Sequence, residues 1–262
     1  MKIAVVTGAS SGLGQEYVRQ LVTNPGELQE IWVIARRKER LEELVQQAKQ
    51  RKPELQFRIL TLDLTREEDL DRLEALLAAE RPDLRILISA AGFGKAGNYR
   101  DVGRRDSAAM IDLNCRAAVE VTQICLDWMG PGSRILQICS TSAFQPFPYL
   151  NVYAASKAFL YRYSRGLRVE LFPRKIRVTA VCPYWIRDTE FIPIAQATDQ
   201  DQSIRHFPFS SRKGNVVRRS LLDSALGLPV STPGIVCSLH RLVAKFIPSE
   251  LMMGLWALIR RL

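Results

Sequence analysis

The sequence lacks several features that would assign it to a specialised class of protein. Its five cysteines have neither metal-ligand spacing nor an even-numbered disulfide framework, so we expect reduced, buried thiols and no metal site. The opening run MKIAVVTG is too short, and too soon followed by glycine, to be a signal sequence, which predicts a cytoplasmic protein. The net charge of +10 comes without a long basic tail, so we expect no nucleic-acid partner. An anionic membrane surface or a phosphorylated cofactor would also attract such a charge.

The sequence does contain a regular alternation of short apolar runs and longer helical patterns. A hydrophobic share of 47% and a charged share of 24% are those of an ordinary globular protein. Short apolar runs that alternate with helices indicate parallel strands covered on both faces. We therefore predict one doubly wound, Rossmann-type α/β domain with a mostly parallel sheet over residues 1–262. The expected strands are 3–8, 31–36, 57–64, 84–92, 133–140 and 176–183, and the expected helices are 12–22, 38–50, 66–80, 107–129 and 153–172.

This alternation ends after Pro183. Residues 184–234 contain a long stretch of Pro, Ser, Gln and aromatic residues without a clear period, which indicates a loop or short helices forming a lid over the site. The alternative is a disordered insertion. Aromatic residues in this region favour an apolar substrate, and they are Tyr184, Trp185, Phe191, Phe207 and Phe209.

The last segment, residues 238–262, predicts a C-terminal helical extension of two amphipathic helices separated by Pro248. Leucine and other apolar residues recur there at helical spacing, and Arg241, Lys245, Arg260 and Arg261 contribute to the polar side. The helices either pack on the domain as a lid or rest on an anionic membrane surface as a peripheral contact. A membrane span is not expected, because the proline and the charges interrupt any run of about 20 apolar residues.

A glycine-rich turn, TGASSGLG, lies where the first expected strand leads into the first expected helix. Gly8, Gly12 and Gly14 let the backbone turn tightly and approach a pyrophosphate, whose charge the amides at the helix N-terminus stabilise. The spacing differs from Gly-x-Gly-x-x-Gly. A glycine-rich turn without a ligand is the alternative.

Two arginines follow the second expected strand, where a dinucleotide-binding fold that prefers NAD carries an acid. The guanidinium of Arg36 or Arg37 can bind a 2′-phosphate, and Ser10 in the glycine turn can add a hydroxyl contact. These residues favour NADP(H) as the cofactor. A solvated charge cluster at the start of a helix is the alternative, and it applies best to Lys38 and Arg40.

Asp63 ends the third expected strand and has two equally good roles. Its carboxylate can accept a hydrogen bond from the exocyclic amine of an adenine. It can also help to cap the next helix, for which Thr65 is the stronger capping residue.

The stretch VYAASKAFL places Tyr153 one helical turn before Lys157, so both side chains lie on one face of the helix. A free tyrosine titrates near about pH 10, and a neighbouring ammonium is expected to lower that pKa into a range useful for proton transfer. A core-facing tyrosine is the structural alternative. His206 and His240 lie outside all of these motifs, and we assign neither a role.

Four separated motifs together resemble those of the short-chain dehydrogenase/reductase family, over the chain from its start to about Pro183. They are TGASSGLG, Asn114 in IDLNCRAA, Ser140 in ICSTS and the Tyr-x-x-x-Lys pair in VYAASK. The resemblance implies that Tyr153 exchanges the proton, Ser140 hydrogen-bonds the substrate oxygen, and Asn114 supports a water linked to Lys157. It also implies a cofactor site of Gly8, Ser10, Ser11, Gly12, Leu13, Gly14, Arg36, Arg37, Asp63, Leu64, Ala91, Gly92, Tyr153, Lys157 and Pro183.

The resemblance further implies hydride transfer between NADP(H) and a ketone or secondary alcohol. The aromatic residues of the predicted lid favour an apolar substrate of this kind, steroid-like or acyl-chain-like. A homodimer or homotetramer is implied as well, with helices 107–129 and 153–171 packed across a two-fold axis. The alternative from another class is a catalytically silent NADP(H)-binding sensor or scaffold. Ser89 and Ala90 depart from the family pattern, because asparagines are common at both positions. Tyr184 departs from it too, since it replaces a glycine after Pro183.

Overall fold

The fold is built on one parallel sheet, seen in a computed structural model that describes residues 1–201, 203–204 and 209–260. Seven strands of the described chain form it in the order β3-β2-β1-β4-β5-β6-β7, and each neighbouring pair is parallel. The strands are β1 Lys2–Thr7, β2 Glu30–Ala35, β3 Gln56–Thr61, β4 Asp83–Ser89, β5 Arg134–Ile138, β6 Arg177–Val181 and β7 Val230–Ser231. Phe207, His206 and Arg261 lie outside the described residues.

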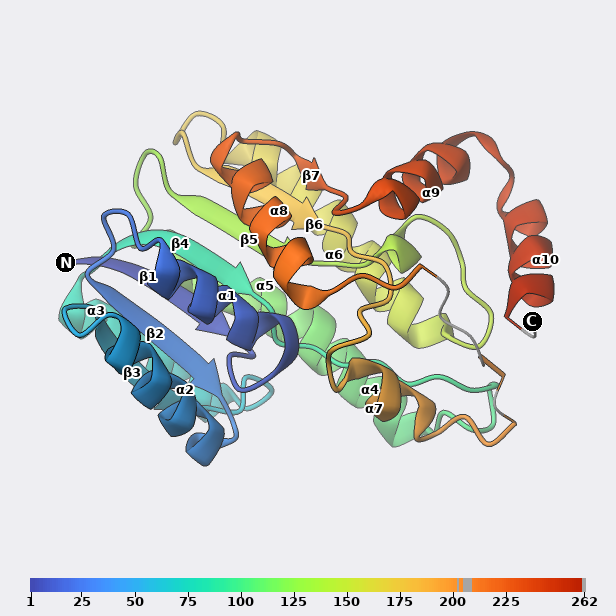
Figure 1. Ribbon diagram of the computed structural model, residues 1–262, viewed down its shortest axis with the longest axis horizontal. Coiled ribbons are helices and arrows are strands. Elements are labelled where there is room, and N and C mark those ends of the chain that lie inside the picture. Colours follow the sequence, from blue (N-terminus) through green and yellow to red (C-terminus); the bar gives the residue numbers. More distant parts are fainter. Residues whose placement is uncertain (202, 205–208, 261–262) are drawn as a thin grey trace.

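Helices cover both faces of the sheet (Figure 1). One face carries α1 (Gly12–Thr23), α2 (Lys38–Arg51) and α8 (Lys213–Ala225), and the other carries α3 (Glu67–Glu80), α5 (Ala117–Leu126) and α6 (Asn151–Glu170). The predicted doubly wound α/β fold is confirmed.

The central strand β1 shows why its apolar run is continuous rather than alternating. Residues Ile3 to Val6 are all completely buried, and successive side chains point to opposite faces of the sheet. Ala4 and Val6 pack in the core beneath α1 and α2, whereas Ile3 and Val5 pack in the core beneath α3 and α5. A strand buried on both faces needs apolar residues at every position.

The predicted helix 107–129 is in fact interrupted. It consists of α4 (Arg104–Ile111), a π-helical turn η1 (Asp112–Arg116) and α5. The π turn contains Asn114, whose side chain is fully buried and hydrogen-bonded to residues outside the helix. Single π turns within α-helices are frequent at functional sites, and apolar periodicity does not reveal one inserted residue.

The region 184–234 contains more regular structure than the predicted lid. Among its described residues, the part that lines the cavity is the loop from Tyr184 to Glu190 and the short helix α7 (Phe191–Gln196), whereas α8 packs against α1 and β7 pairs with β6. The sequence predicts only loops or short helices across most of this region. The alternation of strands and helices therefore continues by one helix, α8, and one strand, β7, beyond its predicted end.

The predicted pair of C-terminal helices is confirmed. They are α9 (Ile235–Phe246) and α10 (Ser249–Ile259), with Pro248 between them, and they project from the end of the molecule far from the N-terminus (Figure 1). Among the residues that the structure describes, none of the helices is long and apolar enough to cross a membrane.

Candidate active site

A cavity of about 530 Å³ opens where β1 ends beside β2 and β4. This is the position where ligands bind in doubly wound folds, at the carboxyl ends of strands whose connections diverge. Most of the residues predicted for the site line it, and they are Gly8, Ser10, Ser11, Gly12, Leu13, Arg36, Arg37, Asp63, Leu64, Ala91, Gly92, Ser140, Tyr153, Lys157 and Pro183. Gly14 and Asn114 were also predicted, but they lie behind this lining.

The glycine turn at the start of α1 leaves no room for side chains at two positions. A Cβ atom on Gly14 would lie 2.3 Å from the carbonyl oxygen of Gly8. Gly8 itself has a φ of +66°, and a Cβ there would lie 2.8 Å from the carbonyl oxygen of Ala90. Glycine is therefore required where β1, β4 and α1 meet, and the backbone remains open toward the cavity.

A threonine ties β4 to this turn. Thr7 at the end of β1 accepts hydrogen bonds at Oγ1 from the backbone amides of Ala90 (3.0 Å) and Ala91 (3.1 Å). The family pattern has asparagines at the positions of Ser89 and Ala90, whose absence weakens one tie between this strand and the cofactor site. In this chain Thr7 connects the same segments.

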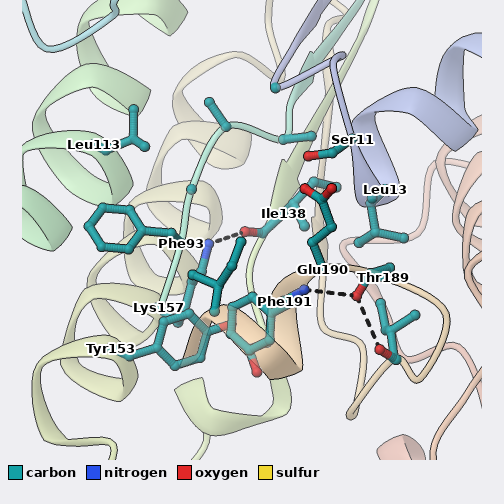
Figure 2. Close-up of a pocket in the computed structure, with 18 of the residues that line it drawn as sticks. Ser11, Leu13, Phe93, Leu113, Ile138, Tyr153, Lys157, Thr189, Glu190 and Phe191 are labelled. Atoms are coloured by element: carbon teal, nitrogen blue, oxygen red, sulfur yellow. Dashed lines mark hydrogen bonds between the residues drawn. The ribbon is translucent and has the colours of Figure 1, made fainter. Parts of the chain in front are cut away.

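Tyr153 and Lys157 lie one turn apart on α6 and both face the cavity, as Figure 2 shows. Both are buried, at 8% and 5% exposure. The Lys157 ammonium donates a hydrogen bond to the carbonyl oxygen of Ile138 (2.8 Å) and lies 5.8 Å from the centre of the Tyr153 ring. The pair is therefore positioned by a helix on one side and by the end of β5 on the other.

Burial controls the protonation of this pair. Desolvation raises the pKa of the Tyr153 phenol above its ordinary value, and the hydrogen bond with Ser140 offsets only part of that rise. Burial likewise lowers the pKa of the Lys157 ammonium. The sequence predicts that Lys157 lowers the pKa of Tyr153, but in this structure that pKa is raised, and loss of solvent is the largest cause. A phenol in this state is a proton donor.

Ser140 and Asn114 both make structural hydrogen bonds in addition to their predicted roles. Ser140 Oγ accepts from the amide of Ser142 (3.1 Å), which caps the short helical turn Thr141–Ala143, and it also bonds Tyr153. The Asn114 side chain holds the backbone of Phe93, with Nδ2 donating to the carbonyl oxygen (2.9 Å) and Oδ1 accepting from the amide (3.1 Å). Ser156 on α6 accepts from the same Nδ2 (3.0 Å).

Gly92 separates Asn114 from the cavity. A Cβ atom on Gly92 would lie 2.8 Å from Asn114 Oδ1 and 3.3 Å from Lys157 Nζ. Asn114 thus supports the loop after β4 and lies close to the lysine without reaching the cavity wall. Its burial in a π turn explains why a poor helix former stands there.

The two arginines after β2 have different surroundings. The Arg36 side chain is 70% exposed, and its guanidinium lies 3.6 Å from the Asp63 carboxylate. Arg37 is less exposed and donates from Nε to Ser10 Oγ (3.3 Å). Arg37 therefore stands beside the predicted Ser10 hydroxyl, while Arg36 remains free to turn toward a ligand.

Asp63 lies between the cavity and the turn that precedes α3. It lines the cavity, and its Oδ1 accepts from the amide (3.1 Å) and the hydroxyl (2.7 Å) of Thr65. Partial burial acts to raise the pKa of Asp63, but these bonds and Arg36 together lower it. The predicted capping by Thr65 is wrong, since the residue at the start of α3 is Arg66 and no side chain caps that end.

Several cavity residues carry no sequence signal. Phe93, Leu113 and Ile138 line the cavity from three different elements. Thr189 and Glu190 approach it from the segment before α7, and Figure 2 shows Glu190 extending toward the turn that bears Ser11. These residues lie in different parts of the sequence, and only the folded structure brings them to one cavity.

The remaining titratable residues offer no second centre. Within the described ranges, no three His, Cys, Asp or Glu side chains are grouped in a way that could hold a metal ion. His240 lies on α9, where its Nε2 shares a hydrogen bond with Gln145 Oε1 (2.9 Å), and burial lowers its pKa. Its contacts are those of a packed helix.

Comparison with known proteins agrees with this geometry. The chain is 30% identical to a very-long-chain 3-oxoacyl-CoA reductase of Podospora anserina over 189 residues, which are 70% of this chain and 54% of that longer relative. It is 31% identical to an NADP-dependent 3-hydroxy acid dehydrogenase of Salmonella typhi over 206 residues, covering 77% of this chain and 79% of the relative. A short-chain dehydrogenase of Sphingobium yanoikuyae, solved in complex with NADPH, superposes with a TM-score of 0.77 at 26% identity, covering 95% and 97% of the two chains.

The family model for short chain dehydrogenases matches residues 2–200, which include the glycine turn, Asn114, Ser140 and the Tyr153–Lys157 pair. The matched region covers six of the seven strands described above. With its sheet order, its glycine turn and its buried tyrosine and lysine, this chain belongs to the short-chain dehydrogenase family of oxidoreductases.

Proposed function

We propose that the protein is an NADP(H)-dependent reductase that converts an apolar ketone to a secondary alcohol. The observation that carries the proposal is the convergence of Ser140, Tyr153 and Lys157 on the same cavity as the glycine turn. Hydride chemistry needs a proton donor beside the reacting oxygen, and Tyr153 is buried in this cavity, where loss of solvent raises its pKa.

The residues of the cavity fit a dinucleotide phosphate. The close approach of Gly8 and Gly14 leaves no room for side chains at these positions. The backbone amides at the start of α1 are therefore uncovered and can bind a pyrophosphate. Arg36 and Arg37 stand where a 2′-phosphate would lie, and the neutral Ser10 hydroxyl lies beside Arg37. NADPH when bound would supply the hydride, and the rest of the reaction depends on the side chains of this chain.

Tyr153 would donate its phenolic proton to the carbonyl oxygen of the substrate, and Ser140 would hold that oxygen by a hydrogen bond. Lys157, beside the phenol, would stabilise the phenolate that remains. Burial raises the pKa of the phenol, so the proton stays on Tyr153 until the substrate oxygen takes it. Oxidation of an alcohol would use the same residue, as phenolate, as its base.

The substrate part of the cavity favours an apolar ketone of steroid-like or acyl-chain-like bulk. Its walls beyond Tyr153 come from the loop before α6 and from the segment around α7, and they are Phe147, Leu150, Trp185, Ile186, Phe191 and Ile194. Tyr184 also lines the cavity, at the position where the family pattern has glycine. The similarity to a reductase of very-long-chain 3-oxoacyl-CoA agrees with an apolar chain in this space.

The test is consumption of NADPH with a panel of ketones that increase in apolar size. We expect turnover that rises with apolar bulk. A catalytically silent sensor or scaffold is the competing function, and it would bind NADPH without consuming it on any member of the panel. Release of alcohol product in step with NADPH loss decides between the two.

We also propose that two copies of the chain pair through α4, α5 and α6, with a tetramer as an extension of the same contact. Ile111 on α4 and Phe159 and Val169 on α6 are 52%, 48% and 73% exposed, which leaves apolar surface on the expected interface. Light scattering at micromolar concentration should give twice the mass of one chain, and Phe159→Asp should shift it toward the monomer. A wild-type monomer would contradict this pairing.

We propose that the C-terminal helices combine the two roles that the sequence leaves open. Met252 and Trp256 on α10 are buried, and the Trp256 indole donates to the carbonyl oxygen of Pro148 (3.0 Å) beside the cavity wall. The opposite face stays open, with Ile235, Leu239, Leu242 and Phe246 on α9 and Leu251, Leu255 and Leu258 on α10. We propose that this exposed face rests on an anionic membrane surface, with Arg241 and Lys245 toward the lipid headgroups.

Truncation before Ser249 should preserve NADPH binding but weaken activity on apolar ketones, because it removes the Trp256 contact beside Phe147. Vesicle co-sedimentation separates the roles, since we expect binding to anionic liposomes that falls with salt and is lost on truncation. Leu242→Asp with Phe246→Asp should abolish that binding and leave NADPH affinity unchanged. No binding at low salt would restrict the helices to the lid role.

A further inference from the structure

Glu190, in the segment before α7, forms ion pairs with two arginines at the start of α2. Glu190 Oε2 lies 3.1 Å from Arg37 Nη1, and Glu190 Oε1 lies 2.5 Å from Arg40 Nη1. The three side chains are 42–43% exposed, so each charge can still reach solvent. Glu190 is 153 and 150 residues away from its partners, and it connects the segment before α7 to the start of α2.

The neighbours of Glu190 cover two other parts of the site. The Thr189 side chain approaches the glycine turn, where a Cβ atom on Gly12 would lie 3.8 Å from it. The Phe191 ring lies on Tyr153, with ring centres 5.2 Å apart. Three consecutive lid residues therefore contact the arginines, the glycine turn and the proton-donating tyrosine. The Glu190 ion pairs connect this segment to the start of α2.

The same guanidinium is needed by two anions. Arg37 is one of the two arginines placed to bind a 2′-phosphate, and in this structure Glu190 uses its Nη1. A phosphate carries more negative charge than a carboxylate and offers more acceptor oxygens to an arginine fork. It would therefore displace the Glu190 carboxylate, which is 42% exposed, from Arg37.

Resting on the proposed use of NADP(H), we propose that Glu190 is an electrostatic latch that competes with the 2′-phosphate of the cofactor for Arg37. Binding of that phosphate frees residues 189–191 from α2, which lifts Phe191 from Tyr153 and opens the substrate side. A cofactor without the 2′-phosphate leaves the latch closed. Glu190 thus links recognition of the cofactor to access to the proton donor.

The first test measures cofactor affinity by calorimetry on the full-length chain. Glu190→Gln should tighten NADPH binding about threefold to tenfold and leave NADH binding unchanged, because it removes a competitor worth one or two exposed ion pairs. Glu39→Gln is the matched control, since it removes an exposed carboxylate from the first turn of α2 and should change neither affinity. Equal or weaker NADPH binding by Glu190→Gln would overturn the latch.

The second test follows the lid without turnover, by hydrogen exchange of the backbone amides in Phe191–Gln196. Adenosine 2′,5′-bisphosphate should speed their exchange in the wild type, and adenosine 5′-phosphate should not. In Glu190→Gln the exchange should be fast without either nucleotide. Equal exchange in wild type and variant would overturn the latch alone, while failure of the wild type to prefer NADPH over NADH would overturn the proposed cofactor as well.

Discussion

Tyr153→Phe is expected to lower turnover by about 10²- to 10⁴-fold and to leave NADPH affinity unchanged. The substitution removes only the phenolic oxygen, so the ring still packs against Phe191 and still fills the buried position on α6. Without that oxygen no proton reaches the developing alkoxide, and Ser140 loses its partner. Steady-state kinetics with the best ketone of the panel, together with calorimetry of NADPH binding, measure both quantities.

Two further variants serve as a control and a comparison for Tyr153→Phe. Tyr161→Phe makes the same change on the same helix, at a residue that is not part of the cavity lining, and should keep full activity. Lys157→Met should damage turnover and NADPH affinity together, because the ammonium lines the cavity beside Tyr153. Near-wild-type turnover by Tyr153→Phe on any substrate that the protein converts would rule out this tyrosine as the proton donor.

Replacement of the arginines after β2 should remove the preference for NADPH over NADH. A charge-assisted contact to the 2′-phosphate contributes on the order of 1.5–3 kcal/mol, which corresponds to about tenfold or more in affinity. Arg37→Ala should have the larger effect, because Arg37 is less exposed than Arg36 and lies beside Ser10. The affinity for NADH should change little in either variant, since NADH has no 2′-phosphate.

Calorimetry with both cofactors on the wild type, Arg36→Ala and Arg37→Ala measures these affinities. Arg51→Ala is a matched control that removes the same charge from the opposite end of α2, and it should keep the wild-type preference. Equal affinities of the wild type for NADPH and NADH would contradict the proposed binding of a 2′-phosphate by these arginines.

The parts of the fold that the sequence predicts are those with a strong local signal. Apolar runs such as Ile3 to Val6 are buried on both faces, and the amphipathic helices α2 and α3 end within one residue of their predicted limits. In contrast, β7 has two residues and is defined by its pairing with β6. The π turn at Asn114 inserts one residue into a helical pattern, and it is stabilised by Phe93 and Ser156, which are distant in sequence.

The same distinction applies to the candidate site. Glycines, the Tyr153–Lys157 spacing and the arginines after β2 are visible in the chain because each depends on its own backbone element. Glu190 is not visible, because its contacts join segments about 150 residues apart. The raised pKa of Tyr153 is not visible in the sequence either, since its main cause is burial, which depends on packing from several elements.

The central claim is that Tyr153 protonates a ketone while a hydride is delivered from NADPH in the cavity at the end of β1. Its most direct test incubates the wild-type chain with NADPH deuterated at the transferring carbon of the nicotinamide and with a bulky apolar ketone, followed by mass spectrometry of the product. We predict an alcohol that carries one deuterium at the former carbonyl carbon, formed mole for mole with NADP⁺. Tight NADPH binding with no deuterium in any product of the ketone panel would contradict the account and leave the protein as a sensor or scaffold.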